Sequence, residues 1–306
     1  MESVLSVLPQ HIVELLRRYI DEDVQEIRLR INRPIELIRK DEPIFYSVLP
    51  VKEDFAYMLS QLSQSSMYML EEELQKGYIT IKGGHRVGLA GRVITENGKV
   101  KAIRDITSLN IRIAREKIGI GESLIDSLYD RKWLNTVIIG APQSGKTTML
   151  RDLARLVSTG VERKRIPSQK VGIVDERSEI AGCLDGVPQH TFGPRVDVLD
   201  ACPKAEGMMM LIRSMSPNVL IVDEVGRVED TEAILEAVHA GVSLILTAHG
   251  SSVKDMATRP SLKALIDACI IDRFVLLSNR NGPGTVEGIF QREVKRMKDG
   301  IEGVRK

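Results

Sequence analysis

Residues 140–147 read Gly-Ala-Pro-Gln-Ser-Gly-Lys-Thr, and this G-x-x-x-x-G-K-T spacing is typical of a loop that binds nucleotide phosphates. The glycines let backbone N–H groups approach phosphate oxygens closely, while Lys146 can reach the β- and γ-phosphates and Thr147 can bind Mg²⁺. The apolar TVIIG segment before this G-K-T loop and the amphipathic segment after it argue against a chance match. The candidate binding residues are Gly140, Ala141, Pro142, Gln143, Ser144, Gly145, Lys146, Thr147 and Thr148.

A nucleotide site also needs a carboxylate at the end of a neighbouring strand, and the segment PNVLIVDE supplies two. Asp223 is suited to outer-sphere contact with Mg²⁺, and Glu224 is suited to polarising the attacking water. Two adjacent acids can also simply end a strand before a helix. Their place after an apolar strand, downstream of the G-K-T loop, favours the metal and catalytic roles and so favours hydrolysis over mere nucleotide sensing.

Two more apolar segments end in polar residues. VGIVDERSEI offers Asp175, Glu176 and Glu179, which could serve the same site or form a solvated turn. LILTAH ends in Thr247 and His249. A histidine at the mouth of a parallel sheet could sense the γ-phosphate, or it could be structural, and the residues alone leave both possibilities open.

The elements that would position these residues alternate between apolar strands and amphipathic helices. This alternation predicts an α/β domain with a parallel sheet buried on both faces. A long loop is expected through 178–204. The expected strands are 135–140, 170–176, 218–224 and 242–249, and the expected helices are 122–133, 146–157, 204–215 and 229–240.

The first third of the chain shows mixed α and β patterns. We expect helical structure within 4–21, 51–64 and 66–76, a strand at 24–31, two short strands in 33–48, and a strand meander over 78–115. The aperiodic segment EKIGIG (116–121) is a linker candidate. The predicted division is an α+β domain at 1–115, this linker, and an α/β domain at 122–306.

Composition narrows the classes of function. The 306 residues carry 43 basic and 42 acidic side chains and 4% aromatics, which disfavours a nucleic-acid binder. Three scattered cysteines predict neither structural zinc nor a disulfide framework. Without an apolar run long enough to span a bilayer or a signal peptide, the chain is expected to be cytoplasmic. The basic tail 291–306 is expected to be a solvated end.

The run RSMSPNVLIVDEVGRVEDTEAILEAVHAGVSLILTAHGSS (213–252) closely resembles the core of the secretion and pilus motor ATPases. VDERSEI stands where those proteins carry an acidic box, and RVGLAGRV with IRDITSLNIRI resembles the arginine-bearing strands of their amino-terminal domain. The resemblance covers most of 80–280 and is strong over 138–252. It implies a RecA-like P-loop NTPase core after a smaller α+β domain, hydrolysis of ATP with Mg²⁺, and a hexameric ring.

The resemblance also implies roles for individual residues. Glu224 would be catalytic, Glu176 would assist at the water or metal, and His249 would couple the γ-phosphate state to movement. Many relatives carry glycine in place of Asp223 and a four-cysteine zinc module that has no counterpart here. Arginines would complete the site from the adjoining domain or subunit; the leading candidates are Arg112 and Arg213, and the others are Arg86, Arg92, Arg104 and Arg195.

Four stretches resemble a sporulation branch of this family more closely: GGHRVGLAGR, GAPQSGKTTMLRDLAR, GPRVDVLDACPKAEGMMMLIRSMSP and VDEVGR. That branch implies an ATPase on the mother-cell face of a channel between mother cell and forespore, reached through a membrane protein partner. The main hypothesis is therefore a hexameric motor. The alternatives are a nucleotide-dependent switch or scaffold with little turnover, and a nucleic-acid motor, which the composition disfavours.

Overall fold

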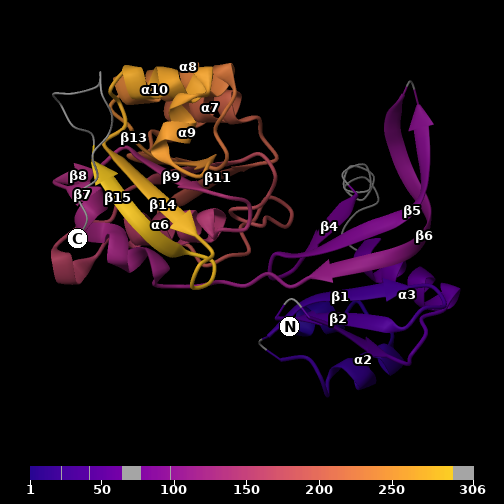
Figure 1. Cartoon of the computed structure of the whole chain (residues 1–306). Helices are drawn as coiled ribbons and strands as arrows, with labels where there is room; N and C mark the ends of the chain where they lie inside the picture. Colours follow the sequence, from indigo (N-terminus) through magenta and orange to yellow (C-terminus); the bar gives the residue numbers. More distant parts are fainter. Residues whose placement is uncertain (22, 41, 64–76, 97, 292–306) are drawn as a thin grey trace. The chain divides into compact units, whose positions relative to one another are not determined.

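The computed structural model describes residues 1–306 except 22, 41, 64–76, 97 and 292–306 (Figure 1). The chain forms two compact units. Unit 1 comprises Met1–Arg115 with Gly182–Gln189, and unit 2 comprises Glu116–Ala181 with His190–Lys306. The segment 182–189, which the sequence division left in the second domain, thus groups with unit 1. The expected helix at 66–76 and the tail from 292 onward lie outside the described residues.

Unit 1 contains a six-stranded antiparallel sheet in the order β3-β2-β1-β6-β5-β4. Alternating apolar residues such as Ile27, Val87 and Ile111 point to one face, where they pack against Leu16 and Phe55 of the helices. Pro9 separates the two helices of the expected 4–21 region. The elements are α1 (Glu2–Leu5), α2 (Gln10–Leu16), β1 (Val24–Arg30), β2 (Ile35–Arg39), β3 (Glu42–Tyr46), α3 (Lys52–Leu62), β4 (Tyr78–Ile81), β5 (His85–Glu96) and β6 (Lys99–Arg112).

Unit 2 is built on a seven-stranded sheet in the order β11-β10-β12-β13-β9-β14-β15. All neighbouring pairs are parallel except β14 and β15, which are antiparallel, so the sheet is mixed. The α/β class with parallel strands is confirmed. The strands are β9 (Thr136–Gly140), β10 (Val171–Asp175), β11 (Val196–Asp200), β12 (Val219–Val222), β13 (Ser243–His249), β14 (Arg273–Ser278) and β15 (Thr285–Gln291).

Helices cover both faces of this sheet, with α6 on one side and α7, α8 and α10 on the other (Figure 1). Successive residues of β9 alternate between the two cores: Val137 packs in the core with α7 and α8, and Ile138 packs in the core with α6. The central strands are therefore apolar throughout. The helices are α6 (Lys146–Thr159), α7 (Lys204–Met215), α8 (Val228–His239), α9 (Val253–Ala257) and α10 (Pro260–Asp267).

Two sequence expectations in unit 2 were wrong. The helix expected at 122–133 is instead a 3₁₀ turn (Ile120–Leu124), a four-residue helix α5 (Ile125–Leu128) and a two-strand hairpin of β7 (Tyr129–Asp130) and β8 (Lys132–Trp133). Arg131 has a φ of 58°, which turns the chain there. The loop expected through 178–204 contains strand β11.

The chain from 253 to 291 forms α9, α10, β14 and β15, which were not among the expected elements. Within the part of the chain that the structure describes, no helix combines the length and the apolar composition needed to cross a membrane.

Candidate functional site

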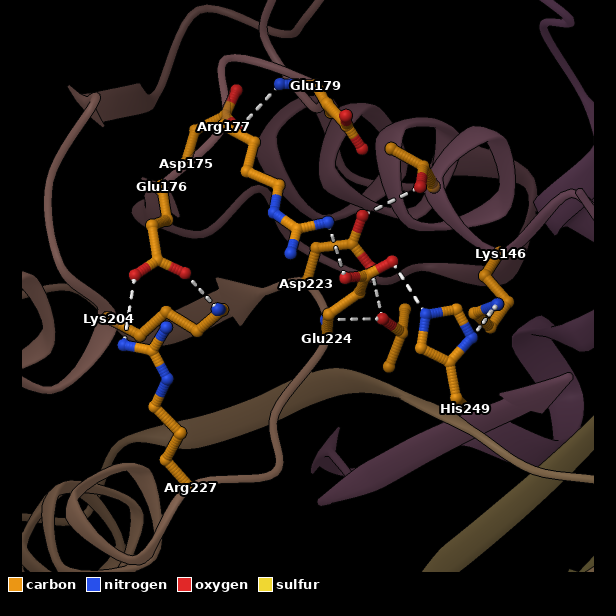
Figure 2. A network of polar contacts seen from close by, with 12 residues as sticks. Lys146, Asp175, Glu176, Arg177, Glu179, Lys204, Asp223, Glu224, Arg227 and His249 are labelled. Carbon is orange, nitrogen blue, oxygen red and sulfur yellow. Dashed lines mark hydrogen bonds and ion pairs between the residues drawn. The ribbon is translucent and has the colours of Figure 1, made fainter. Parts of the chain in front are cut away.

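Four parallel strands bring the predicted motifs to one edge of the sheet in unit 2. Strands β9, β10, β12 and β13 run in the same direction, so the residues after their carboxyl ends meet there. The G-K-T loop, the acids after β10, Asp223 and Glu224 after β12, and His249 at the end of β13 lie together (Figure 2). This edge is the candidate site.

The G-K-T loop requires its second glycine. Gly145 has a φ of 87°, and a Cβ there would lie 2.6 Å from the backbone nitrogen of Gly284. Gly284 in turn donates its N–H to the carbonyl of Ser144 at 2.9 Å, so the β14–β15 turn packs against the loop. Helix α6 begins at Lys146, directly after the loop and without a side-chain cap, and the N–H groups of a first helical turn have no partner within the helix, as an anion site needs.

Lys146 is held at the mouth of the site. Its Nζ donates to the carbonyls of Gly140 and Ala141 at 3.0 and 2.9 Å and lies 3.3 Å from Nδ1 of His249. Burial lowers the pKa of Lys146 below its usual value, while the charges of Asp223 and Glu224 oppose this effect. The ammonium of Lys146, at the start of α6, is therefore close enough to the carboxylates of Asp223 and Glu224 to feel their charges.

Thr147 and Asp223 form a pair that fits Mg²⁺. The Thr147 hydroxyl donates to Oδ2 of Asp223 at 2.7 Å, and the Thr247 hydroxyl donates to the other oxygen of that carboxylate. Among the described residues, no cluster of three or more His, Cys, Asp and Glu side chains could hold a metal. Mg²⁺ typically takes one or two protein ligands with phosphate oxygens and waters, so this hydroxyl–carboxylate pair suits Mg²⁺ that arrives with a nucleotide.

Glu224 is fixed through its backbone and both carboxylate oxygens. Its φ of 53° is left-handed, and its N–H donates to Oγ1 of Thr247 at 2.8 Å. Oε1 lies 2.8 Å from Nε2 of His249, and Oε2 lies 3.1 Å from Nη1 of Arg177. His249 thus links Glu224 to Lys146 through its two ring nitrogens.

The acids at the end of β10 and just after it lie in different environments. Asp175 is buried and accepts the N–H groups of Glu179, Ile180 and Ala181, and its burial raises the pKa to about 6 despite these hydrogen bonds. Asp175 therefore organises the turn with both of its oxygens, and it lines the hollow at this edge of the sheet together with Glu179.

Glu176 is paired with cations. It accepts from Lys204, the first residue of α7, and lies 3.5 Å from Arg227. Burial alone would raise the pKa of Glu176, but the hydrogen bond from Lys204 and the charges of Arg227 and Arg177 bring that pKa below its usual value.

The arginines expected to complete the site divide between the two units. Arg112 belongs to β6 in unit 1, where it pairs with Glu26 at 3.3 Å. Arg213 is in the last turn of α7, nine residues and about 14 Å along the helix from Lys204. Arg195 precedes β11 at the amino edge of the sheet. In one chain, neither Arg195 nor Arg213 reaches the carboxyl edge, and Arg86, Arg92 and Arg104 belong to unit 1.

Three cations at the site were missed by sequence reasoning: Arg177, Lys204 and Arg227. The one available signal was the position of Arg177 inside the acidic segment VDERSE, directly after Glu176. Arg227 comes three residues after Glu224 and Lys204 opens α7, both far in sequence from Glu176, and folding brings them to that residue (Figure 2).

The family model described as sporulation stage III, protein AA, matches residues 1–297. Stage III sporulation protein AA of Bacillus subtilis (strain 168) is 60% identical over 296 residues, which cover 96% of each chain. Among solved structures, the Legionella pneumophila ATPase DotB has a TM-score of 0.61 at 15% identity, over 88% of this chain and 76% of that one.

The pilus retraction motor PilT with bound ADP has a TM-score of 0.59 at 14% identity, over 86% of this chain and 76% of that one. At such identities the two structures establish a likeness of fold alone. The fold of this chain is therefore similar to the folds of DotB and of the pilus retraction motor PilT.

Proposed function

The chain belongs to the sporulation stage III protein AA family, and we propose that it is an ATP-hydrolysing motor of the secretion-ATPase type. The motor would energise the assembly of a channel between mother cell and forespore, or transport through it. It would use ATP and Mg²⁺ in a RecA-like P-loop core, preceded by a smaller α+β domain.

The observation that carries this proposal is the placement of Glu224. Its carboxylate lies at the same sheet edge as the G-K-T loop and is linked through His249 to Lys146, the residue that would hold the β- and γ-phosphates. A protein that only binds a nucleotide has no need of an oriented carboxylate beside the γ-phosphate. This arrangement therefore supports hydrolysis.

Each residue of the site would have its own role in ATP binding and hydrolysis. The loop N–H groups and Lys146 would bind the phosphates, and Thr147 with Asp223 would hold Mg²⁺, which supplies neutralising charge at the β- and γ-phosphates. Glu224 would orient and polarise the attacking water. His249 would relay the position of the γ-phosphate, because it contacts both Lys146 and Glu224.

The proposed oligomeric state and location rest on the resemblance to the secretion and pilus motor ATPases. We place the protein in the cytoplasm on the mother-cell side, as a homo-oligomer, expected to be a hexamer, docked on a membrane protein of the channel complex. Neither nucleic acid nor zinc is part of the proposed activity. Arg112 from unit 1 and Arg213 from a neighbouring copy are the candidates for completing the site, as the family resemblance implies.

One observation favours a second candidate, a nucleotide-dependent switch or scaffold with little turnover. Both oxygens of Glu224 already have partners, His249 and Arg177, and the Lys146 ammonium is held by two carbonyls. Such a site could bind ATP and hydrolyse it slowly until a partner changes these contacts.

Steady-state phosphate release from the full-length protein separates the two candidates. Glu224→Gln should keep nucleotide binding and lose roughly 100-fold or more in rate, because it removes the water-orienting carboxylate. Lys146→Ala should lose both binding and turnover. Arg163→Ala, which alters only an exposed pair with Glu122, is the control. Equal rates for wild type and Glu224→Gln would rule out the motor.

A further inference from the structure

We infer that Arg177 is a positioning residue for hydrolysis, which acts by holding the carboxylate of Glu224 in its working orientation. This inference rests on the proposed function, since it assigns a role within that same site. Arg177 lies on the turn after β10, and its guanidinium extends toward Glu224 across the hollow at the sheet edge (Figure 2).

With the contact from Arg177, each oxygen of the Glu224 carboxylate has a partner. Nη1 of Arg177 lies 3.1 Å from Oε2, while Nε2 of His249 lies 2.8 Å from Oε1. A single partner would leave the carboxylate free to rotate about its last bond. With a partner on each oxygen, the rotation of the carboxylate is restricted, and Glu224 has less rotamer freedom to lose when substrate arrives.

The backbone of Glu224 does not supply this orientation by itself. Its φ of 53° and its N–H bond to Thr247 fix where the side chain begins. The carboxylate is three rotatable bonds further out, and a quarter of the side chain is exposed. The position of the two oxygens therefore depends on the residues that contact them.

Arg177 is itself placed by an ordered turn. The preceding Asp175 is buried and accepts three backbone N–H groups, and the following Ser178 has a φ of 53° and donates its hydroxyl to Asp200 at 2.6 Å. The backbone of Arg177 is thus anchored on both sides. An arginine on so ordered a turn loses less freedom when it binds Glu224 than one on a loose loop would.

The neighbouring cations have another partner. Lys204 and Arg227 both pair with Glu176, the residue directly before Arg177. Consecutive side chains of this turn therefore point in different directions: Glu176 points toward the cations Lys204 and Arg227, and Arg177 points toward Glu224 after β12 (Figure 2). Arg177 also adds a positive charge beside Glu224, which reduces the repulsion between that carboxylate and a triphosphate.

Removing the guanidinium should slow the chemical step and spare binding. In the full-length protein, Arg177→Ala should lower kcat by roughly 10-fold and leave KM within about twofold, because Glu224 loses its orientation while the phosphate-binding loop is intact. Arg177→Lys should recover part of the loss, because an ammonium can still reach Oε2. Arg163→Ala is the matched control, since its side chain is 60% exposed and that of Arg177 is 63% exposed.

A double-mutant cycle tests whether Arg177 acts through Glu224. In single-turnover hydrolysis, Arg177→Ala should cause no further loss in a Glu224→Gln background, and affinity for a non-hydrolysable ATP analogue should be unchanged there. A further loss, weaker analogue binding, or an unchanged or raised kcat in Arg177→Ala would overturn the inference. The proposed function fails separately, if Glu224→Gln hydrolyses ATP as fast as wild type. Arg177→Gln, with its similar reach, covers the case in which the alanine variant does not fold.

Discussion

His85 is a buried histidine at the start of β5 in unit 1. Its side chain is nearly inaccessible, and Nδ1 accepts the backbone N–H of Ala114 at 2.9 Å. An accepting nitrogen must be unprotonated, so this environment favours the neutral ring. Burial, with a smaller effect of the N-terminal ammonium, lowers the pKa of His85 from 6.5 to about 4.

This histidine should make stability fall in acid. The unfolded chain binds a proton at His85 near pH 6.5, whereas the folded chain binds it near pH 4, so the stability it contributes is complete above pH 6.5 and is lost as pH falls toward 4. His85→Asn keeps an acceptor near Nδ1 but does not titrate. Between pH 7 and pH 4.5, wild type should lose about 2 kcal/mol relative to this variant in urea unfolding. Parallel pH curves would contradict the assignment.

At the site, the sequence predicted Lys146 and the acids but missed three further cations. Glu224 and His249 could be located because each follows an apolar strand, and parallel strands deliver their carboxyl ends to one edge. Arg177 could not, because an arginine in an acidic turn has the pattern of an ordinary solvated residue. Arg177 reaches its partner Glu224 because Asp175 anchors the turn, and the spacing of apolar and polar residues in the sequence does not indicate such an anchor.

Among the elements, helix α6 holds the segment that joins the two units. Asp152 lies buried one and a half turns after the G-K-T loop, and its Oδ2 accepts the N–H groups of Gly119 and Gly121 at 3.0 and 2.8 Å. Its other oxygen accepts from Nε of Arg155 at 2.8 Å. The linker expected at 116–121 is therefore fastened to the helix that begins at the candidate phosphate site.

Asp152→Ala should release this linker. Two backbone N–H groups and an arginine would lose their acceptor, at a cost of about 2–4 kcal/mol in the free energy of unfolding. Trypsin should then cut after Lys117 faster than in wild type. Asp126→Ala, which removes an 83% exposed carboxylate paired with Lys164, is the control and should change both readouts little. An unaltered cutting rate in Asp152→Ala would show that the linker is held by other contacts.

The elements that sequence reasoning missed are those decided by tertiary contacts. Strand β11 carries aspartates at Asp197 and Asp200 and lies half-buried at the sheet edge, so its composition does not indicate a strand. The hairpin at 129–133 has helical spacing, but its Trp133 is fully buried in the core with α6. The buried central strands, by contrast, were evident from their apolar runs.

At the scale of the whole molecule, the main prediction concerns assembly. If the site is completed by an arginine from another copy, ATP should favour association. Native mass measurement of the Glu224→Gln variant should show a species of six copies with ATP and Mg²⁺, and mainly smaller species without nucleotide. Arg213→Ala should weaken this dependence, while Arg163→Ala should not. A distribution of masses that is the same with and without ATP would contradict coupling between the site and assembly.

The chain passes between its two units three times, at 115–116, at 181–182 and at 189–190. Gln189, at the end of the middle excursion, accepts the N–H of Gly83 in unit 1 at 3.0 Å. A gene cut at the linker would leave the first fragment without its eight-residue insert and the second with that insert unpacked. The amino-terminal unit therefore cannot be exchanged between proteins as a simple cassette. Recombination within this family should therefore keep the gene segments that encode the two units together.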